Sequence, residues 1–167
     1  IIHFVNSYDN LIPEGDGIIS KSKNLLLCIS LADCGSVIFY DNEYSIIANI
    51  HCGWRGAKEG IIEKTCKFLF DFQKAESFNA IICPMIQSEN YCVGNVFENY
   101  FPENFFYKQN GNLHFKLNEY IESELRRQGI RNISNTKTDT FANKHRFYSF
   151  RRDGETGRMC SFIGLKD

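Results

Sequence analysis

The chain has 167 residues, of which 43% are hydrophobic and 23% are charged, an ordinary globular composition that excludes intrinsic disorder. Its formal net charge is −1, from 19 basic and 20 acidic residues, so we expect no nucleic-acid partner attracted by overall charge. No run of about 18 apolar residues is present, so we expect neither a membrane-spanning segment nor a membrane partner.

The cysteines favour a reducing compartment. There are seven, an odd number without CxxC pairs, in a chain that has enough apolar residues to form a core. No signal peptide is recognisable, and we therefore expect a cytoplasmic protein. Four of the cysteines have apolar neighbours and are expected to be buried in the core: Cys28, Cys66, Cys83 and Cys160.

The first half of the chain reads mainly as strands. Residues 2–5, 18–19 and 25–30 are predicted strands, with a turn-rich stretch at residues 7–17. The apolar runs 37–40 and 45–50 are joined by Asp-Asn-Glu and predict a hairpin. After a Gly-Trp-Arg-Gly turn the apolar spacing changes to three and four residues, which predicts a helix over residues 57–73.

The second half alternates between strands and helices. A helix is predicted over residues 117–128, where two arginines and Gly129 supply the usual C-terminal charge and cap. A shorter helical segment is expected after residues 91–94, and Pro102 interrupts it. Strands are expected at residues 79–83, 130–134, 147–150 and 159–165. The order of elements predicts an α+β fold: one layered mixed-sheet domain with helices packed on the sheet.

A thiol and an imidazole mark the open end of the predicted hairpin. Cys34 precedes its first strand and His51 ends its second, so the two side chains can meet in space. A Cys and a His in contact suit either a nucleophile with its base or a transition-metal site. A metal site needs a further ligand, and the remaining histidines are His3, His114 and His145.

Charged and aromatic residues near this pair are further candidates. Asp33 precedes the thiol and is a candidate general base or partner of a ligand histidine. Trp54 either stacks on a base or fills the core, and Arg55 is placed to bind an anion where a helix begins. Three arginines share a glycine-bearing loop suited to phosphate, or pinned by its own acidic residues: Arg151, Arg152 and Arg158.

These motifs give the chain a recognisable relationship. Ala-Asp-Cys at residues 32–34, His-Cys-Gly-Trp-Arg-Gly at 51–56 and the run 147–159 resemble the YfiH or polyphenol oxidoreductase laccase domain family. The resemblance implies a single catalytic domain of that type over residues 1–167, without the additional N-terminal residues of the family. It also implies a metal site of His3, Cys34 and His51.

The family resemblance implies a zinc-dependent enzyme that cleaves adenosine, inosine or methylthioadenosine with phosphate, with adenosine deaminase activity attributed to relatives. One thiolate and two imidazoles suit zinc with one open position, whereas copper(II) in a reducing compartment would threaten the thiolate. The expected partners are therefore a purine nucleoside and phosphate, the phosphate being held by Arg55 and the arginine loop.

Two alternatives remain open from the sequence. In one, Cys34 is the nucleophile and His51 the base of a cysteine hydrolase or amidase that edits peptidoglycan precursors, a role proposed for relatives. In the other, the chain is a non-catalytic zinc-binding module. Alkylation of Cys34 before and after chelation separates a free nucleophile from a metal ligand.

Overall fold

The computed structural model describes residues 1–7 and 14–167, so residues 8–13 of the predicted turn lie outside the described part. The main sheet has the strand order β1-β2-β5-β4-β6-β10. Its outer pairs, β1–β2 and β6–β10, are parallel and the inner pairs are antiparallel. These strands are β1 (Ile2–Phe4), β2 (Gly17–Ser20), β4 (Gly35–Asp41), β5 (Ile47–Cys52), β6 (Phe78–Ile82) and β10 (Asn132–Asn135).

Among the described residues, two smaller sheets and four α-helices complete the fold. The strands β3 and β11 pair with each other, and a three-stranded sheet has the order β7-β9-β8. Their bounds are β3 (Leu26–Leu31), β11 (Met159–Gly164), β7 (Cys92–Val93), β8 (Phe106–Gln109) and β9 (Asn112–Phe115). The α-helices are α1 (Trp54–Lys58), α2 (Ile61–Leu69), α3 (Leu117–Arg127) and α4 (Phe150–Asp153), and the 3₁₀ helices are Ala75–Ser77, Ser88–Asn90, Asn95–Asn99 and Glu103–Phe105.

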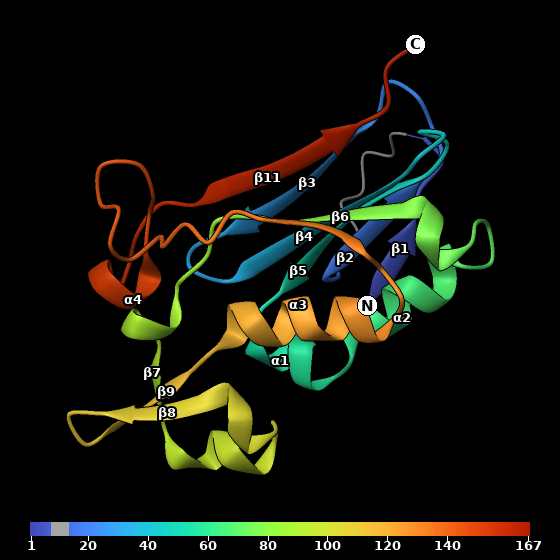
Figure 1. The fold of residues 1–167 in the computed structure, drawn as a ribbon. Helices are drawn as coiled ribbons and strands as arrows, with labels where there is room; N and C mark the ends of the chain where they lie inside the picture. Colours follow the sequence, from blue (N-terminus) through green and yellow to red (C-terminus); the bar gives the residue numbers. More distant parts are fainter. Residues whose placement is uncertain (8–13) are drawn as a thin grey trace.

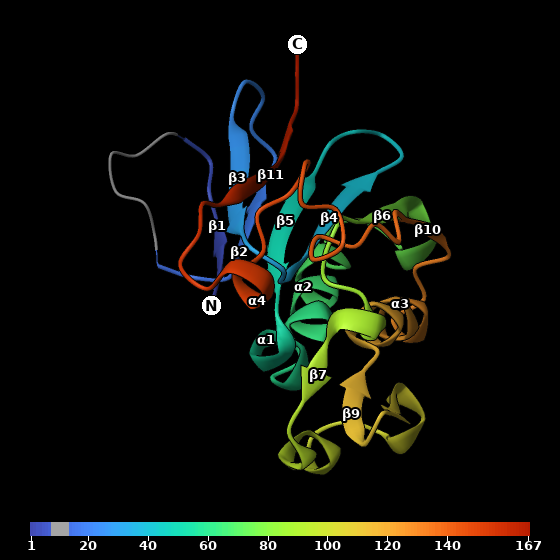
Figure 2. The ribbon, with the colours of Figure 1, turned by 90° about the vertical axis from the view of Figure 1, so that its left-hand side faces the viewer.

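The main sheet is covered on both faces. In Figures 1 and 2, α1, α2 and α3 lie on one side of it, and the β3–β11 pair lies on the other. The small sheet of β7, β8 and β9 extends below the helices in Figure 1. This confirms the predicted α+β class, with helices packed on a mixed sheet.

The pleat of the central strands decides which side chains enter the site. On β5, Ala48, Ile50 and Cys52 belong to the main hydrophobic core on the helix side. Ile47 belongs to a second cluster with Leu27 of β3. Successive side chains of a strand alternate between faces, so His51 shares the β3–β11 side of the sheet with Ile47.

The same alternation places His3 on that side. Phe4, the residue after His3 on β1, packs against Phe68 of α2 with ring centroids 5.5 Å apart. His3 therefore points to the opposite face, where it pairs in register with Ile18 of β2. His3 of β1 and His51 of β5 thus lie on one face of one sheet.

Several predicted elements differ from those observed. The helix predicted over residues 57–73 is two helices, α1 and α2, because Gly60 adopts a left-handed conformation, φ 73°, that ends the first and begins the second. The strand predicted over 147–150 is wrong. The chain there turns into α4, whose first turn Ser149 caps by accepting a hydrogen bond from the Arg152 amide.

Two of the four cysteines expected in the core are exposed. Cys66 is fully buried and Cys83 half-buried, but Cys28 and Cys160 lie on the outer face of the β3–β11 pair. Along β3 the buried side chains alternate with exposed ones, and Cys28 falls on the exposed set. Apolar neighbours in sequence did not reveal this, because in a half-covered strand every second residue faces solvent.

Candidate functional site

The turn between β3 and β4 carries the first site residues. Here the chain crosses from the outer pair of strands to the main sheet, and Asp33 takes a left-handed conformation with φ 81°. Its buried carboxylate accepts hydrogen bonds from the hydroxyls of Thr140 and Ser149, at 2.7 and 2.9 Å, and from the Arg151 amide at 2.7 Å. Asp33 thereby fastens the start of α4 to the turn that presents Cys34.

Cys34 and His51 meet around Gly53, as the hairpin predicted. The register pairs Gly35 with Cys52, which brings the residues beside them to the same edge of the sheet. A Cβ atom at Gly53 would lie 3.1 Å from the Cys34 Sγ and 3.5 Å from the His51 Nε2. An added side chain there would contact both the thiol and this edge of the imidazole ring, so Cys34 and His51 lie against the same side of Gly53.

The other ring nitrogen of His51 faces a carboxylate. Its Nδ1 lies 3.3 Å from Asp16 Oδ1, and the backbone amide of His51 donates to the Asp16 carbonyl at 2.6 Å. A carboxylate on Nδ1 holds the proton there and directs Nε2 toward a ligand. From the sequence, Asp33 is one candidate for this role, but in the structure Asp33 contacts Thr140, Ser149 and Arg151, and Asp16 contacts His51. The available signal was the Gly-Asp-Gly turn before β2, whose Gly17 pairs with Ile50.

His3 lies at the same end of the sheet but is engaged elsewhere. With His51 it lines a pocket of about 310 Å³ between β1, β2 and β3. Its Nε2 is 2.9 Å from the carbonyl of Glu14, an acceptor only, so this nitrogen donates. Within residues 1–7 and 14–167, no three His, Cys, Asp or Glu side chains lie close enough together to hold a metal ion.

Two arginines act electrostatically on the Cys34 thiol. Burial raises the pKa of Cys34, and the neighbouring Asp33 carboxylate adds to this, whereas the guanidinium groups of Arg158 and Arg55 act in the opposite direction. Both arginines are exposed. The α4 loop and the start of α1 therefore bring positive charge to the space beside Cys34.

The other two arginines of the loop have different roles. The Arg152 guanidinium donates to the carbonyls of Thr140, Phe141 and Phe147 and pairs with Asp153 at 2.7 Å. These bonds shape the loop, which is the structural reading that the sequence left open for Arg152. Arg151 donates to the Cys92 carbonyl, and its Cζ lies 5.2 Å from the centre of the Tyr91 ring. Arg151 is exposed and borders the site.

Trp54 packs against protein rings. Its indole lies 4.8 Å from the Phe97 ring and 6.3 Å from the Tyr100 ring, measured between centroids. The Arg55 Cζ lies 4.5 Å from the centroid of the Trp54 ring. The structure thus shows packing of Trp54 on protein rings, and stacking on a base stays a prediction. The indole supports the start of α1 and the arginine that follows it.

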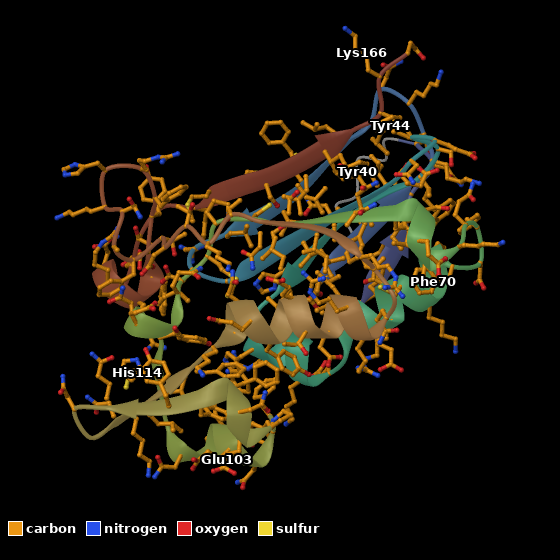
Figure 3. All side chains as sticks on the ribbon, in the orientation of Figure 1. Tyr40, Tyr44, Phe70, Glu103, His114 and Lys166 are labelled. Atoms are coloured by element: carbon orange, nitrogen blue, oxygen red, sulfur yellow. The ribbon has the colours of Figure 1, made fainter. Side chains whose placement is uncertain are left out.

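The remaining histidines take no part in this arrangement. His114 is buried in the small sheet, marked in Figure 3, where its Nδ1 is 2.8 Å from the Ser88 carbonyl and its ring stacks on Tyr107. His145 is exposed in the segment before α4. No helix in the described part of the chain has the length and apolar character needed to cross a membrane.

Sequence and structure comparisons place the chain among known proteins. Residues 1–166 match the family described as multi-copper polyphenol oxidoreductase laccase. The chain belongs to this family. The family includes YfiH-type proteins: the crystal structure of Bacillus licheniformis YfiH, titled a hypothetical protein, superimposes with a TM-score of 0.85 at 32% identity, covering 90% of this chain and 61% of that one. Neisseria meningitidis NMB0706 gives the same TM-score at 28% identity, covering 93% and 66%.

Similar curated proteins carry the name purine nucleoside phosphorylase. One from Aquifex aeolicus is 32% identical over 90% of this chain and 70% of its own length. One from Campylobacter jejuni is 34% identical over 99% of this chain and 74% of its own length. The chain spans about two thirds of the length of such relatives. It covers 62% of the length of a purine nucleoside phosphorylase from Rickettsia prowazekii.

Proposed function

We propose that this chain is a zinc-dependent purine nucleoside phosphorylase that cleaves adenosine, inosine or methylthioadenosine with phosphate. The names of its relatives support the reaction class. The observation that carries the proposal is the placement of the Cys34 thiol and the His51 Nε2 against the same side of Gly53, with Asp16 behind the ring. Adenosine deamination at the same centre is a second activity to test.

The donor set fits zinc in its chemistry. Cys34 and His51 would hold the ion, and His3 would complete a set of one thiolate and two imidazoles after a shift of its ring, because the three side chains do not lie close enough together in the described structure. A carboxylate behind a ligand histidine is the usual outer support of such a site, and Asp16 provides it. When bound, zinc supplies a Lewis acid with one open coordination position. Ligation through His3 Nε2 requires that this nitrogen give up its bond to the Glu14 carbonyl.

The arginines are assigned to phosphate. Arg55 and Arg158 are exposed and act on the charge of Cys34, and Arg151 borders the same space. In phosphorolysis a phosphate oxygen bonds to the ribose C1′, the bond to the purine nitrogen breaks, and the nitrogen keeps the electron pair and takes up a proton. Guanidinium groups hold and orient the phosphate for that attack.

Asp33 is assigned a positioning role. Three protein donors already occupy its carboxylate. A general base needs a lone pair directed at the substrate, whereas this carboxylate is buried and directed at α4 and Thr140. It holds Arg151 and the loop that carries Arg158 close to Cys34.

Metal content and a product screen test the proposal together. Purified protein should carry about one zinc per chain, by elemental analysis, and should release base from adenosine, inosine or methylthioadenosine only when phosphate is present. Cys34→Ala and His51→Ala should lose zinc and activity together. The matched controls are Cys160→Ala and His145→Ala, an exposed thiol and an exposed histidine away from the site. Activity without zinc would refute the metal assignment, and zinc without turnover would indicate a binding module.

One observation favours the alternative function, a cysteine hydrolase. A thiol, an imidazole and a carboxylate follow one another as Cys34, His51 and Asp16, the order of a nucleophile, its base and the residue that orients the base. Burial raises the pKa of Cys34, which works against an unassisted thiolate. Iodoacetamide should label Cys34 only after chelation if zinc holds it, and at once if it is a free nucleophile.

A further inference from the structure

Tyr91 is held firmly at the edge of the site. It follows the 3₁₀ helix Ser88–Asn90, and its amide donates to the Ser88 carbonyl at 3.2 Å. Its own carbonyl accepts from the Phe115 amide at 3.1 Å, and its ring packs against that of Phe115 with centroids 6.0 Å apart. Backbone and ring are fixed from two sides, so the direction of the hydroxyl is fixed as well.

The hydroxyl of Tyr91 has no protein partner among the described residues, although only 8% of the residue is exposed. A tyrosine this deeply buried normally satisfies its hydroxyl. No enclosed side-chain nitrogen or oxygen in the described chain lacks a partner, so the phenol oxygen is not sealed in the core and opens onto accessible space. A ligand bound in that space would supply the missing hydrogen-bond partner of the hydroxyl.

The groups around this tyrosine are those of the site. Arg151 covers the ring with its Cζ 5.2 Å from the centroid. Cys34, Asp33 and Arg55 are the other charged or ionisable groups that act on the phenol. A phenol keeps its proton at neutral pH, so the hydroxyl is able to donate.

We infer that Tyr91 is a ligand-contacting residue whose hydroxyl donates a hydrogen bond to an oxygen of the phosphate bound between Cys34 and Arg151. The inference rests on the proposed phosphorolysis, because it takes phosphate as the occupant of the arginine-lined space. An oxyanion suits this position, since it accepts from a neutral hydroxyl and from guanidinium groups at once. The Asp33 carboxylate is no competitor for the hydroxyl, because its own donors occupy it.

The variant Tyr91→Phe removes the hydroxyl and keeps the ring. The matched control is Tyr107→Phe, a half-buried tyrosine of the small sheet that stacks on His114. Binding of inorganic phosphate is measured by calorimetry on wild type and both variants, beside zinc content and the thermal midpoint. Tyr91→Phe should weaken phosphate binding roughly 10- to 100-fold, as expected for a lost hydrogen bond to a charged group, with unchanged zinc and midpoint. Tyr107→Phe should bind as wild type does.

The outcomes separate this inference from the proposed function. If wild type cleaves nucleosides with phosphate and Tyr91→Phe binds phosphate equally well, the inference is wrong and the function stands. If wild type binds phosphate through Tyr91 but cleaves no nucleoside, the function is wrong and the contact stands. If wild type binds no phosphate, the inference is overturned along with the phosphorolysis.

Discussion

Replacing Asp33 by asparagine tests whether this buried carboxylate is structural. It accepts three hydrogen bonds, two at Oδ2 from Ser149 and Arg151 and one at Oδ1 from Thr140. Asparagine keeps one carbonyl oxygen and presents an NH₂ group in place of the other. The Thr140 hydroxyl can rotate to accept from that group, whereas the Arg151 amide can only donate. Asparagine also tolerates the left-handed backbone at φ 81°.

The expected cost of Asp33→Asn is therefore the loss of charge assistance at the remaining bonds, about 2 kcal/mol of unfolding free energy. For a chain of this size that corresponds to a fall in melting temperature of about 4–8 °C. Asp33→Ala removes the acceptors of all three hydrogen bonds and strains the left-handed position, so it should cost about 4 kcal/mol. The control is Asp71→Asn, an exposed aspartate. Thermal and urea unfolding measure both quantities.

Two results would contradict this reasoning. A melting temperature of Asp33→Asn within about 1 °C of wild type would mean that the three bonds contribute little. A variant of wild-type stability whose turnover falls by about 100-fold or more would restore Asp33 as a general base, because removal of such a base costs roughly that much. Destabilisation with turnover retained in the folded fraction at low temperature supports the positioning role.

Two further predictions concern the site and the hairpin. Gly53→Ala places a Cβ 3.1 Å from the Cys34 Sγ and 3.5 Å from the His51 Nε2, and it should lower the zinc content measured by elemental analysis. The control Gly94→Ala, whose Cβ meets nothing within 4 Å, should keep the wild-type zinc content. Equal zinc in both variants would refute a metal held between Cys34 and His51. Burial of Asp41 disfavours its charged form, but hydrogen bonds from Ile46 and Ser45 outweigh this and lower its pKa. Its contribution is thus complete above the unfolded pKa of about 3.9 and is lost as pH falls through the lower folded value. Asp41→Asn should therefore be less stable than wild type at pH 7, with the gap in unfolding free energy narrowing below about pH 4, and a gap of constant size down to pH 2 would contradict this.

Several features of the fold follow from sequence alone because they depend on neighbours along the chain. The hairpin of β4 and β5 was predictable from two apolar runs and a polar connection, and with it the meeting of Cys34 and His51. Helix α3 was predictable from apolar spacing and from Gly129, which adopts φ 91° after the helix. The failures are at residues 57–73 and 147–150. There a left-handed glycine and a serine cap overrode the periodic pattern.

The site was predictable in part. His51 and Cys34 were found because both lie at strand ends in one hairpin. The partner of His51 was missed because Asp16 reaches it through pairing of β2 with β5, across more than thirty residues. Tyr91 was noted only in the stretch that precedes the shorter predicted helical segment, because no spacing rule relates it to Cys34. Arg151 and Arg152 are adjacent in sequence, yet one borders the site and the other binds its own loop.

The sequence by itself determined the α+β class, the hairpin and the meeting of Cys34 and His51 at its end, since hydrophobic period and turn chemistry act over a few residues. Only the tertiary structure decided which face of each strand is covered, and so left Cys28 and Cys160 exposed. It also decided which carboxylate serves His51 and which holds the arginine loop. These contacts join residues that are far apart in the chain, and the packing of the layers sets the distance between them. The local sequence pattern therefore does not predict them.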